Sequence, residues 1–328
     1  MAQFLVIGGA GYVGSHVVWT LRDAGHQVTI FDNFSAGYRE LIGDTPVVEG
    51  DINDAVALRH AFANGPFDAV LHFAAHIEVG ESVQDPLKYY RNNVAGMITL
   101  LEEMRRARVL SIVFSSTAAV YGAPEVVPIP EDSPKLPINP YGRTKAVMED
   151  VMADCHAAYG LNWIALRYFN ASGADPRGRC GEWHNPESHL IPNILMAAAG
   201  KRDAINVFGT DYDTPDGTCV RDYIHVQDLA AAHVRALELL QQGQCGPFNV
   251  GMGTGFSVQE VIAATKEVTG IDFTVNYADR RPGDPPQLIA AVEKFKRVAG
   301  WEPAITDVKT IVRDAWNWHK TRGFGTDR

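Results

Sequence analysis

The first 25 residues place a short apolar run directly before a glycine-rich turn and a helical pattern. Residues 4–7 are Phe-Leu-Val-Ile, which is typical of a buried strand. Gly8, Gly11 and Gly14 follow, and an amphipathic helical pattern then covers residues 15–21. In this context the glycine spacing predicts a dinucleotide-binding turn, with the phosphates of the ligand at the N-terminus of the helix. We expect Gly8 to permit the tight turn, Gly11 to let the backbone approach a pyrophosphate, and Gly14 to let the helix pack closely on the strand.

The next apolar run ends in an acidic residue. Residues 27–31 read as a second strand, and Asp32 follows at the place where a carboxylate would bind the hydroxyl groups of an adenine ribose. No arginine comes directly after Asp32 to hold a 2′-phosphate, so NAD is favoured over NADP as the cofactor. The alternative is an aspartate that only caps a turn at Asp32-Asn33.

Apolar runs recur along the first half of the chain, with helical patterns between them. They lie at residues 28–31, 47–48, 69–73, 111–114 and 163–166. This alternation predicts an α/β fold built on a doubly wound parallel (Rossmann) sheet.

The amino-acid composition changes after Asn170, where glycine, proline, arginine and histidine become frequent. We expect residues 1–170 to form an NAD-binding Rossmann domain and residues 171–328 to form a smaller C-terminal substrate domain. Segments near 222–251 regain core character, so the chain is expected to return to the sheet there.

The composition excludes several classes of partner. A net charge of −10, which no basic face offsets, argues against nucleic acid. No apolar run approaches the ~18 residues that a membrane span requires, and no signal peptide precedes Phe4. The cysteines are Cys155, Cys180, Cys219 and Cys245. Their spacing is unlike that of metal ligands, so no metal site is predicted, and reduced thiols indicate a cytoplasmic protein.

Hydroxyl side chains follow another buried strand. Residues 111–114, Ser-Ile-Val-Phe, lead into Ser115, Ser116 and Thr117. Ligands of doubly wound sheets bind beyond the carboxyl ends of the strands, so these side chains are expected at the mouth of the site. Asn139-Pro140 then reads as the start of a helix, with asparagine as its cap.

That helix would place Tyr141 and Lys145 one turn apart on one face. To oxidise an alcohol, a base must take its proton while hydride leaves for a nicotinamide. A phenol of pKa ~10 is a poor base at neutral pH, and a nearby ammonium would favour phenolate by ~1–3 units, with the positive nicotinamide as a second contributor. We expect Tyr141 to be the base, Lys145 to tune it and Thr117 to bind the same substrate oxygen. The alternative is a surface tyrosine above a solvated lysine.

Longer motifs extend over nearly the whole chain. They lie at residues 8–16, 50–52, 73–75, 79–82, 89–93, 166–170, 216–225 and 280–284. In these motifs the chain resembles the extended short-chain dehydrogenase/reductase family, and within it the enzymes that epimerise UDP-sugars. The resemblance implies NAD as cofactor, a UDP-sugar as substrate and a homodimer. It also implies interconversion of UDP-galactose and UDP-glucose by transient oxidation at C4, with Tyr141 as base and a 4-keto intermediate.

The resemblance also extends the two predicted binding sites. With the residues above, the cofactor site comprises Gly8, Gly11, Tyr12, Val13, Gly14, Asp32, Asn33, Asp51, Ile52, Phe73, Ala74, Ala75, Asn93, Ser115, Tyr141, Lys145 and Tyr168. The substrate site comprises Thr117, Tyr141, Asn170, Leu190, Phe208, Arg221, Arg281 and Asp284. Arginine forks suit a diphosphate, and the alternative for Arg221 and Arg281 is a surface ion pair.

Other activities share this scaffold. Related dehydratases and decarboxylases carry acids after the strand threonine, where this chain has Ala118 and Ala119. Alanine cannot transfer a proton, so dehydration loses its acid and base, whereas epimerisation requires neither. A net nucleotide-sugar dehydrogenase would use the same residues and release NADH. A non-catalytic NAD-binding protein would normally lack Tyr141 or Lys145, and both are present.

Three features leave alternatives open. Ile77 stands where many relatives have a lysine that contacts the cofactor ribose. Leu288 occupies the position that gates the C2 substituent of the sugar, so a 4-epimerase of a UDP-N-acetylhexosamine or a UDP-pentose stays an alternative. Apolar stripes at residues 94–101 and 147–152 fit either a dimer interface or an ordinary core face.

Overall fold

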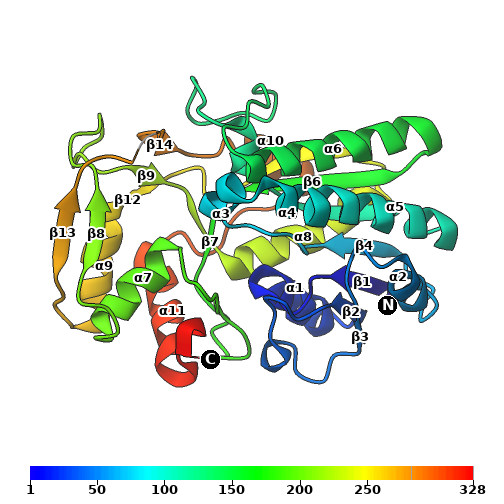
Figure 1. The fold of residues 1–328 in the computed structure, drawn as a ribbon, viewed down its shortest axis with the longest axis horizontal. Coiled ribbons are helices and arrows are strands. Elements are labelled where there is room, and N and C mark those ends of the chain that lie inside the picture. Colours follow the sequence, from blue (N-terminus) through cyan, green and yellow to red (C-terminus); the bar gives the residue numbers. More distant parts are fainter. Residues whose placement is uncertain (282, 328) are drawn as a thin grey trace.

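The computed structural model describes residues 1–281 and 283–327. Its centre is a seven-stranded sheet in which neighbouring strands pair in parallel (Figure 1). In spatial order the strands are β11 (Gly246–Val250), β6 (Asn162–Tyr168), β5 (Ser111–Thr117), β4 (Ala69–His72), β1 (Gln3–Ile7), β2 (Gln27–Asp32) and β3 (Val47–Glu49). The chain order reverses between β1 and β4, which is where doubly wound sheets bind ligands. The predicted fold class is therefore confirmed.

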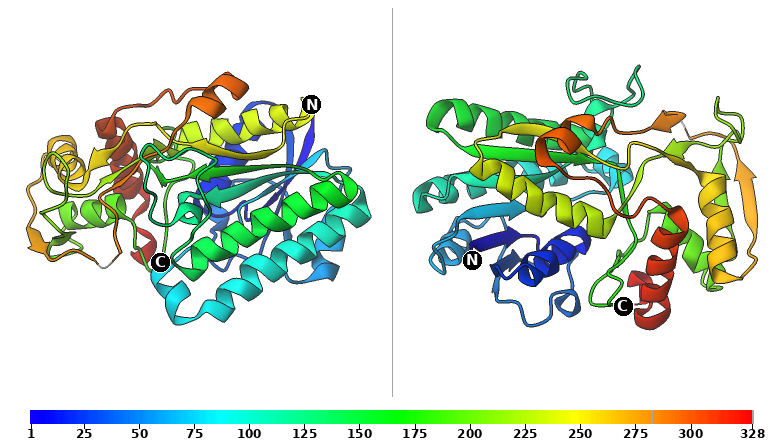
Figure 2. Two further views of the ribbon diagram at one scale, coloured as in Figure 1. Left: turned by 90° about the horizontal axis from the view of Figure 1, so that it is seen from above. Right: turned by 180° about the vertical axis from the view of Figure 1, so that it is seen from behind.

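Helices cover both faces of this sheet (Figure 2). One face carries α1 (Tyr12–Asp23) and α8 (Val226–Gln241), which contact each other. The other carries α2 (Ala55–Phe62), α5 (Gly96–Ala107) and α6 (Pro140–Tyr159). Because both faces are covered, the central strands read as continuous apolar runs and do not alternate with polar residues.

A second, smaller region lies beside the sheet, at the left of Figure 1. Its core joins α7 (Leu190–Ala198), α9 (Val258–Thr269) and α11 (Val308–Arg322). Short strands complete it: β8 (Ile205–Phe208), β9 (Val220–Arg221), β12 (Phe256–Ser257), β13 (Val275–Ala278) and β14 (Gln287–Leu288). β12 and β14 flank β9, and β13 pairs with β8.

The chain passes between the two regions more than once. β7 (Asn170–Ser172) pairs in parallel with β10 (Tyr223–His225), and the expected boundary at residue 170 falls at the start of β7. The segment expected to return to the sheet spans β10, α8 and β11, and β11 pairs with β6 at the edge of the sheet. α10 (Glu293–Ala299) packs into the same cluster as α8 through Phe295.

Shorter elements complete the fold. They are η1 (Arg39–Leu41), α3 (Val79–Gln84), α4 (Pro86–Tyr89), the π-helical turn η2 (Tyr90–Ala95), η3 (Ala118–Tyr121) and η4 (Gly325–Asp327). Within residues 1–281 and 283–327, none of the helices is both long and apolar enough to cross a membrane. All four cysteines are free thiols.

Candidate active site

The glycine-rich turn between β1 and α1 forms one wall of a cleft. Gly8 has φ +79°, and a Cβ there would lie 2.4 Å from the backbone nitrogen of Ala74. A Cβ on Gly14 would lie 2.2 Å from the carbonyl oxygen of Gly8. Both glycines are therefore required by the packing of the protein itself, as predicted for a tight turn and for close contact of helix and strand.

Gly11 differs from the other two fingerprint glycines. A Cβ there would meet nothing closer than the Gly8 carbonyl oxygen, at 3.6 Å, and its backbone is extended at φ −77°. The protein itself leaves room for a side chain at Gly11, so a close approach of a ligand in the cleft is the remaining reason for glycine there. Gly11 is also the N-cap of α1, and no side chain among the described residues caps that end. An open glycine before uncapped N–H groups fits the pyrophosphate of a dinucleotide.

Asp32 lies in the wall of the same cleft, at the end of β2. One carboxylate oxygen accepts from the Ala10 N–H (2.9 Å) and the other from the Phe34 N–H (2.8 Å). Burial raises the pKa of Asp32, and these hydrogen bonds oppose the rise. The carboxylate thus caps the turn, as the alternative for Asp32 expected. It also faces the cleft, and its remaining lone pairs can accept hydrogen bonds from ribose hydroxyls.

The cleft encloses about 620 Å³ and collects many of the predicted cofactor residues. The predicted residues that line it are Gly8, Gly11, Asp32, Asn33, Ile52, Phe73, Ala74 and Ala75. Sequence reasoning missed Ile7, Phe31, Ser35, Ala36, Gly37, Gly50, His76 and Asn92. Most of these flank a recognised motif by one to three positions, which is the only signal the sequence offers for them.

Three other predicted cofactor residues, Tyr12, Val13 and Asp51, do not line the cleft and contact other parts of the protein. The Tyr12 hydroxyl donates to the Gly173 carbonyl (2.7 Å), which ties α1 to the second region. Val13 packs on the cluster beneath α1. Asp51 accepts from the side-chain amide of Asn33 (2.9 Å). These contacts position the walls of the cleft.

Asn93 is buried beside the cofactor cleft that it was expected to line, and its role there stays a prediction. Its amide accepts from the His76 N–H (2.9 Å) and donates to the His76 carbonyl (3.1 Å) and to the Thr144 hydroxyl (3.1 Å). Asn93 therefore holds the loop after β4 against α6, while its neighbour Asn92 lines the cleft.

The carboxyl end of β5 gathers the predicted catalytic residues. α6 begins as predicted, with Asn139 accepting from the Gly142 N–H (2.8 Å) and proline at the first position. The Lys145 ammonium, from the second turn, donates to the Ser115 carbonyl (2.7 Å). The Ser115 hydroxyl forms a short hydrogen bond with the Tyr168 hydroxyl. Ser115, Lys145 and Tyr168 thus form one connected group.

Thr117 contacts Tyr141 in this group. Its Oγ accepts from the Ala119 N–H (3.1 Å), so its proton is left to donate. The Thr117 hydroxyl is close enough to the Tyr141 phenol to lower the pKa of Tyr141 and offset part of its rise. Its predicted role as a donor to a substrate oxygen stays a prediction.

The ionisation of Tyr141 and Lys145 differs from the expectation. Burial raises the pKa of Tyr141 to about 12. Burial lowers the pKa of Lys145 to about 7, against the attraction of the Glu149 carboxylate. Sequence reasoning expected the lysine ammonium to pull the tyrosine toward phenolate. In the ligand-free chain desolvation outweighs that attraction, because it penalises the charged form of both side chains.

A buried ion pair supports the catalytic helix, and sequence reasoning missed it. Glu149, one turn after Lys145, accepts from Ser116 (2.6 Å) and from Arg167 on β6 (2.9 and 2.5 Å). Both charged side chains are 3% exposed or less. The pair joins α6 to β5 and β6, and it supplies the carboxylate that acts on Lys145.

A second and larger pocket, of about 1410 Å³, lies in the smaller region. It brings together six predicted substrate residues: Asn170, Leu190, Phe208, Arg221, Arg281 and Asp284. The lining residues that sequence reasoning missed include Arg202, Tyr223 and Val258. Arg202 and Val258 lie outside the recognised motifs, so only the fold identifies them, whereas Tyr223 lies within the motif at residues 216–225.

The pocket is both basic and aromatic. The Arg281 guanidinium lies over the Phe208 ring, 4.0 Å from its centroid. Arg221 forms an ion pair with Asp284 inside the pocket, where the two side chains are 12% and 27% exposed, so this is not the surface ion pair of the alternative. A guanidinium fork beside an aromatic ring suits a diphosphate joined to a planar base.

Two further positions bear on specificity. Leu288 on β14 pairs with Arg221 on β9 and packs against the cluster that contains Tyr121 and Ile129. It therefore lies next to the basic pocket, as a residue that limits the size of a sugar substituent must. Ile77 is 38% exposed and offers no polar group to the cofactor cleft.

The chain is similar to proteins of known activity. The model of the NAD dependent epimerase/dehydratase family matches residues 4–251. A UDP-glucose 4-epimerase of Halalkalibacterium halodurans is 51% identical over 322 residues, covering 98% of this chain and 96% of that protein. The structure of UDP-glucose 4-epimerase from Brucella ovis in complex with NAD is 46% identical, with a TM-score of 0.94 over 97% of this chain and 98% of that one. The structure from Bifidobacterium longum in complex with NAD⁺ and UDP is 35% identical, with a TM-score of 0.92 over 98% and 99%.

Proposed function

The chain belongs to the NAD dependent epimerase/dehydratase family, and we propose that it is an isomerase that interconverts UDP-galactose and UDP-glucose with NAD as its cofactor. The observation that carries this proposal is the group at the end of β5. A donor hydroxyl and a phenol, Thr117 and Tyr141, contact each other there, and the next two residues are alanines. NAD, when bound in the cleft beside Gly11, would supply reversible two-electron oxidation at C4 of the sugar.

The chain's own residues remove the proton of the sugar hydroxyl and return it. Thr117 donates to the C4 oxygen and holds it beside Tyr141, whose oxygen takes the proton and later returns it. Lys145 is fixed by the Ser115 carbonyl and supplies positive charge when protonated. The same phenol serves both directions, because the proton removed during oxidation is needed again during reduction.

Inversion at C4 requires the keto sugar to present its other face while the UDP stays bound. The pocket in the smaller region suits this task, because Arg221, Arg281 and Phe208 can hold the nucleotide diphosphate away from Tyr141. The sugar is then the only part that must turn. Leu288 borders this space, and we propose that it favours plain hexoses over N-acetylated ones.

Elimination of water is the main competing chemistry on this scaffold, and the site lacks the means for it. Ala118 and Ala119 occupy the first turn of η3, directly after Thr117, and Ala118 is buried against Val120 and Ile129. Neither side chain can act as an acid or base. The same two residues cannot take the C5 proton or protonate the C6 hydroxyl, which favours epimerisation.

The test is incubation of the purified chain with UDP-galactose and without added NAD. We expect UDP-glucose as the product, no accumulation of NADH, and release of NAD when the protein is denatured. A Tyr141→Phe chain that carries the same amount of NAD is the matched control and should form little UDP-glucose. Steady formation of NADH in proportion to consumed sugar would contradict the proposal and indicate a net dehydrogenase.

We also propose that the chain forms a homodimer in the cytoplasm. The apolar stripes of α5 and α6 belong mainly to the core, which favours the core-face alternative for Met97, Leu100 and Met152. Other apolar side chains on α3, α4 and α5 are exposed, namely Val79, Val83, Leu87 and Ile98. Light scattering should give twice the chain mass of 35.9 kDa, and Leu87→Glu should shift it toward the monomer. A monomeric wild-type chain would contradict this proposal.

A further inference from the structure

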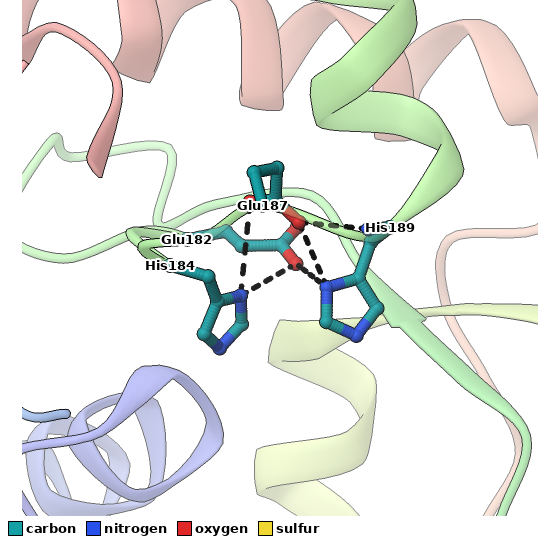
Figure 3. A group of neighbouring side chains, drawn as sticks. All are labelled: Glu182, His184, Glu187 and His189. Atoms are coloured by element: carbon teal, nitrogen blue, oxygen red, sulfur yellow. Dashed lines mark hydrogen bonds and ion pairs between the residues drawn. The ribbon is translucent and has the colours of Figure 1, made fainter. Parts of the chain in front are cut away.

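A single short segment carries four potential metal ligands at the edge of the substrate pocket, which Glu182 and His189 also line. Residues 182–189, between β7 and α7, read Glu-Trp-His-Asn-Pro-Glu-Ser-His. Glu182, His184, Glu187 and His189 converge there, and one ligand atom of each lies within 4.8 Å of the others. Figure 3 shows the Nδ1 atoms of both imidazole rings turned toward the two carboxylates. The prediction of no metal site rested on the cysteines, and none of them lies in this segment.

Three of the four nitrogen–oxygen pairs lie at hydrogen-bond distance, so the ligands of one tetrahedral ion would have to move apart by a few tenths of an ångström. Glu182 Oε1 lies 3.2 Å from His184 Nδ1 and 3.1 Å from His189 Nδ1. Glu187 Oε1 lies 2.9 Å from His189 Nδ1, and Glu187 Oε2 lies 3.7 Å from His184 Nδ1. Ligands at 2.0–2.1 Å from a zinc ion in a regular tetrahedron are about 3.4 Å apart. The observed separations fall on both sides of that value.

The two carboxylates attract positive charge, and against the effect of burial they raise the pKa of both imidazoles, that of His184 to about 9. The Glu182 and Glu187 side chains are 4% and 5% exposed, and two carboxylates so close together repel each other. A divalent ion would bind here in place of the two imidazolium protons, neutralise both carboxylates and use the lone pairs of the two imidazoles, which are then neutral. Imidazole and carboxylate ligands together suit zinc and its neighbours in the first transition row, whereas magnesium and calcium prefer oxygen alone.

We propose that Glu182, His184, Glu187 and His189 bind one divalent transition-metal ion, zinc by the number and kind of its ligands. All four positions of the shell come from the protein, which is the pattern of a structural site. The ion would therefore fix the segment and take no part in the chemistry at Tyr141.

The segment links parts of both binding sites. His189 is the N-cap of α7, and the next residue, Leu190, lines the substrate pocket. The His184 ring meets the edge of Tyr12, in the glycine-rich turn, with 6.0 Å between ring centroids. A metal at this place would hold the first turn of α7 in position against the start of α1. This role goes beyond the proposed function and does not depend on it.

Metal content and cobalt binding test the proposal on the full-length chain. We expect about one zinc ion per chain after purification, and a tetrahedral visible spectrum when Co²⁺ is added to protein stripped with a chelator. His189→Gln should weaken Co²⁺ binding by more than the roughly 10–100-fold that loss of an outer-shell partner costs. His60→Gln, an exposed histidine on α2, is the matched control and should bind like the wild type.

Thermal stability gives an independent measurement. A chelator should lower the unfolding temperature of the wild type and of His60→Gln, and should leave that of His189→Gln unchanged. If His189→Gln does not fold, the cobalt titration of the wild type still decides. A wild-type chain that contains no metal and gives no tetrahedral cobalt spectrum would overturn the proposal, and so would a folded His189→Gln chain that binds Co²⁺ as tightly as the wild type.

Discussion

Replacing Glu149 by glutamine should affect both the stability of the chain and the pH dependence of its activity. The carboxylate accepts two hydrogen bonds from Arg167 and one from Ser116, in a place that solvent does not reach. Glutamine keeps the volume but removes the charge, and its NH₂ group would face a guanidinium that can only donate. The Arg167 charge is then buried without a counter-ion.

The size of the stability loss follows from the burial. Removing one partner of a buried ion pair costs about 3–5 kcal/mol, because the remaining charge stays uncompensated. At roughly 2 °C for each kcal/mol in a chain of this size, the unfolding temperature should fall by roughly 6–10 °C. The double variant Glu149→Met/Arg167→Met removes both charges, so it should recover most of this loss.

The effect on pH dependence comes from the influence of Glu149 on the pKa of Lys145. Burial lowers the pKa of Lys145 to about 7, and the Glu149 carboxylate raises it against that effect. Without the carboxylate the pKa of Lys145 falls further, so at a given pH a smaller fraction of the lysine is charged. If the ammonium is the active form, the Glu149→Gln chain loses activity at neutral pH and its decline on the alkaline side begins at lower pH.

The two effects are measured separately. Thermal unfolding gives the stability of the wild type, the single variant and the double variant, and kcat against pH gives the position of the alkaline limb. The double variant should regain stability and keep the shifted limb. A Glu149→Gln chain as stable as the wild type would refute the ion-pair argument, and an unshifted limb would refute the coupling to Lys145.

Three further predictions concern the two sites. Tyr141→Phe should lower kcat at least ~10²-fold without loss of bound NAD, measured by product formation and by NAD released on denaturation. Leu288→Ser should raise kcat/KM for UDP-N-acetylglucosamine relative to UDP-glucose, and equal ratios in both chains would reject a steric gate. Gly11→Ala should unfold at the wild-type temperature and retain less NAD, whereas Gly14→Ala should also be destabilised, since its Cβ would lie 2.2 Å from the carbonyl oxygen of Gly8.

The fold could be predicted because local and global signals agree. Each central strand is a continuous apolar run, and the helices between them carry one apolar face each, so the sequence indicates a parallel sheet covered on both sides. The elements that carry the proposed catalytic hydroxyl and phenol could also be located, because Thr117 ends a strand and Asn139-Pro140 starts a helix. These positions depend on local rules of strand ends and helix caps.

The features of the site that the sequence did not predict depend on contacts between distant segments, which local sequence patterns do not show. Asn92 lines the cleft and Asn93 is buried next to it, in the π-helical turn η2, which contains one residue more than an α-helical turn would. Periodicity alone does not predict such a turn, so the sequence could not show which of the two side chains faces outward. The ion pair of Glu149 with Arg167 likewise joins a helix to a neighbouring strand, and it can be identified only once those elements are in place.

The pKa shifts of Tyr141 and Lys145 bear on how the phenol could act as a base. Burial raises the pKa of Tyr141 to about 12 and lowers that of Lys145 to about 7, so phenolate needs more positive charge than the lysine supplies. A positive charge nearby would stabilise phenolate, and oxidised nicotinamide carries one whereas reduced nicotinamide does not. We therefore expect the pKa of Tyr141 to be lower in the NAD form than in the NADH form or the cofactor-free chain. Phenolate absorbance titrated in all three states, with Tyr141→Phe as the blank, measures this directly. Equal pKa values in the NAD and NADH forms would leave Lys145 as the only residue that tunes the base, and would remove the reason for the phenol to give up its proton in one redox state and take it back in the other.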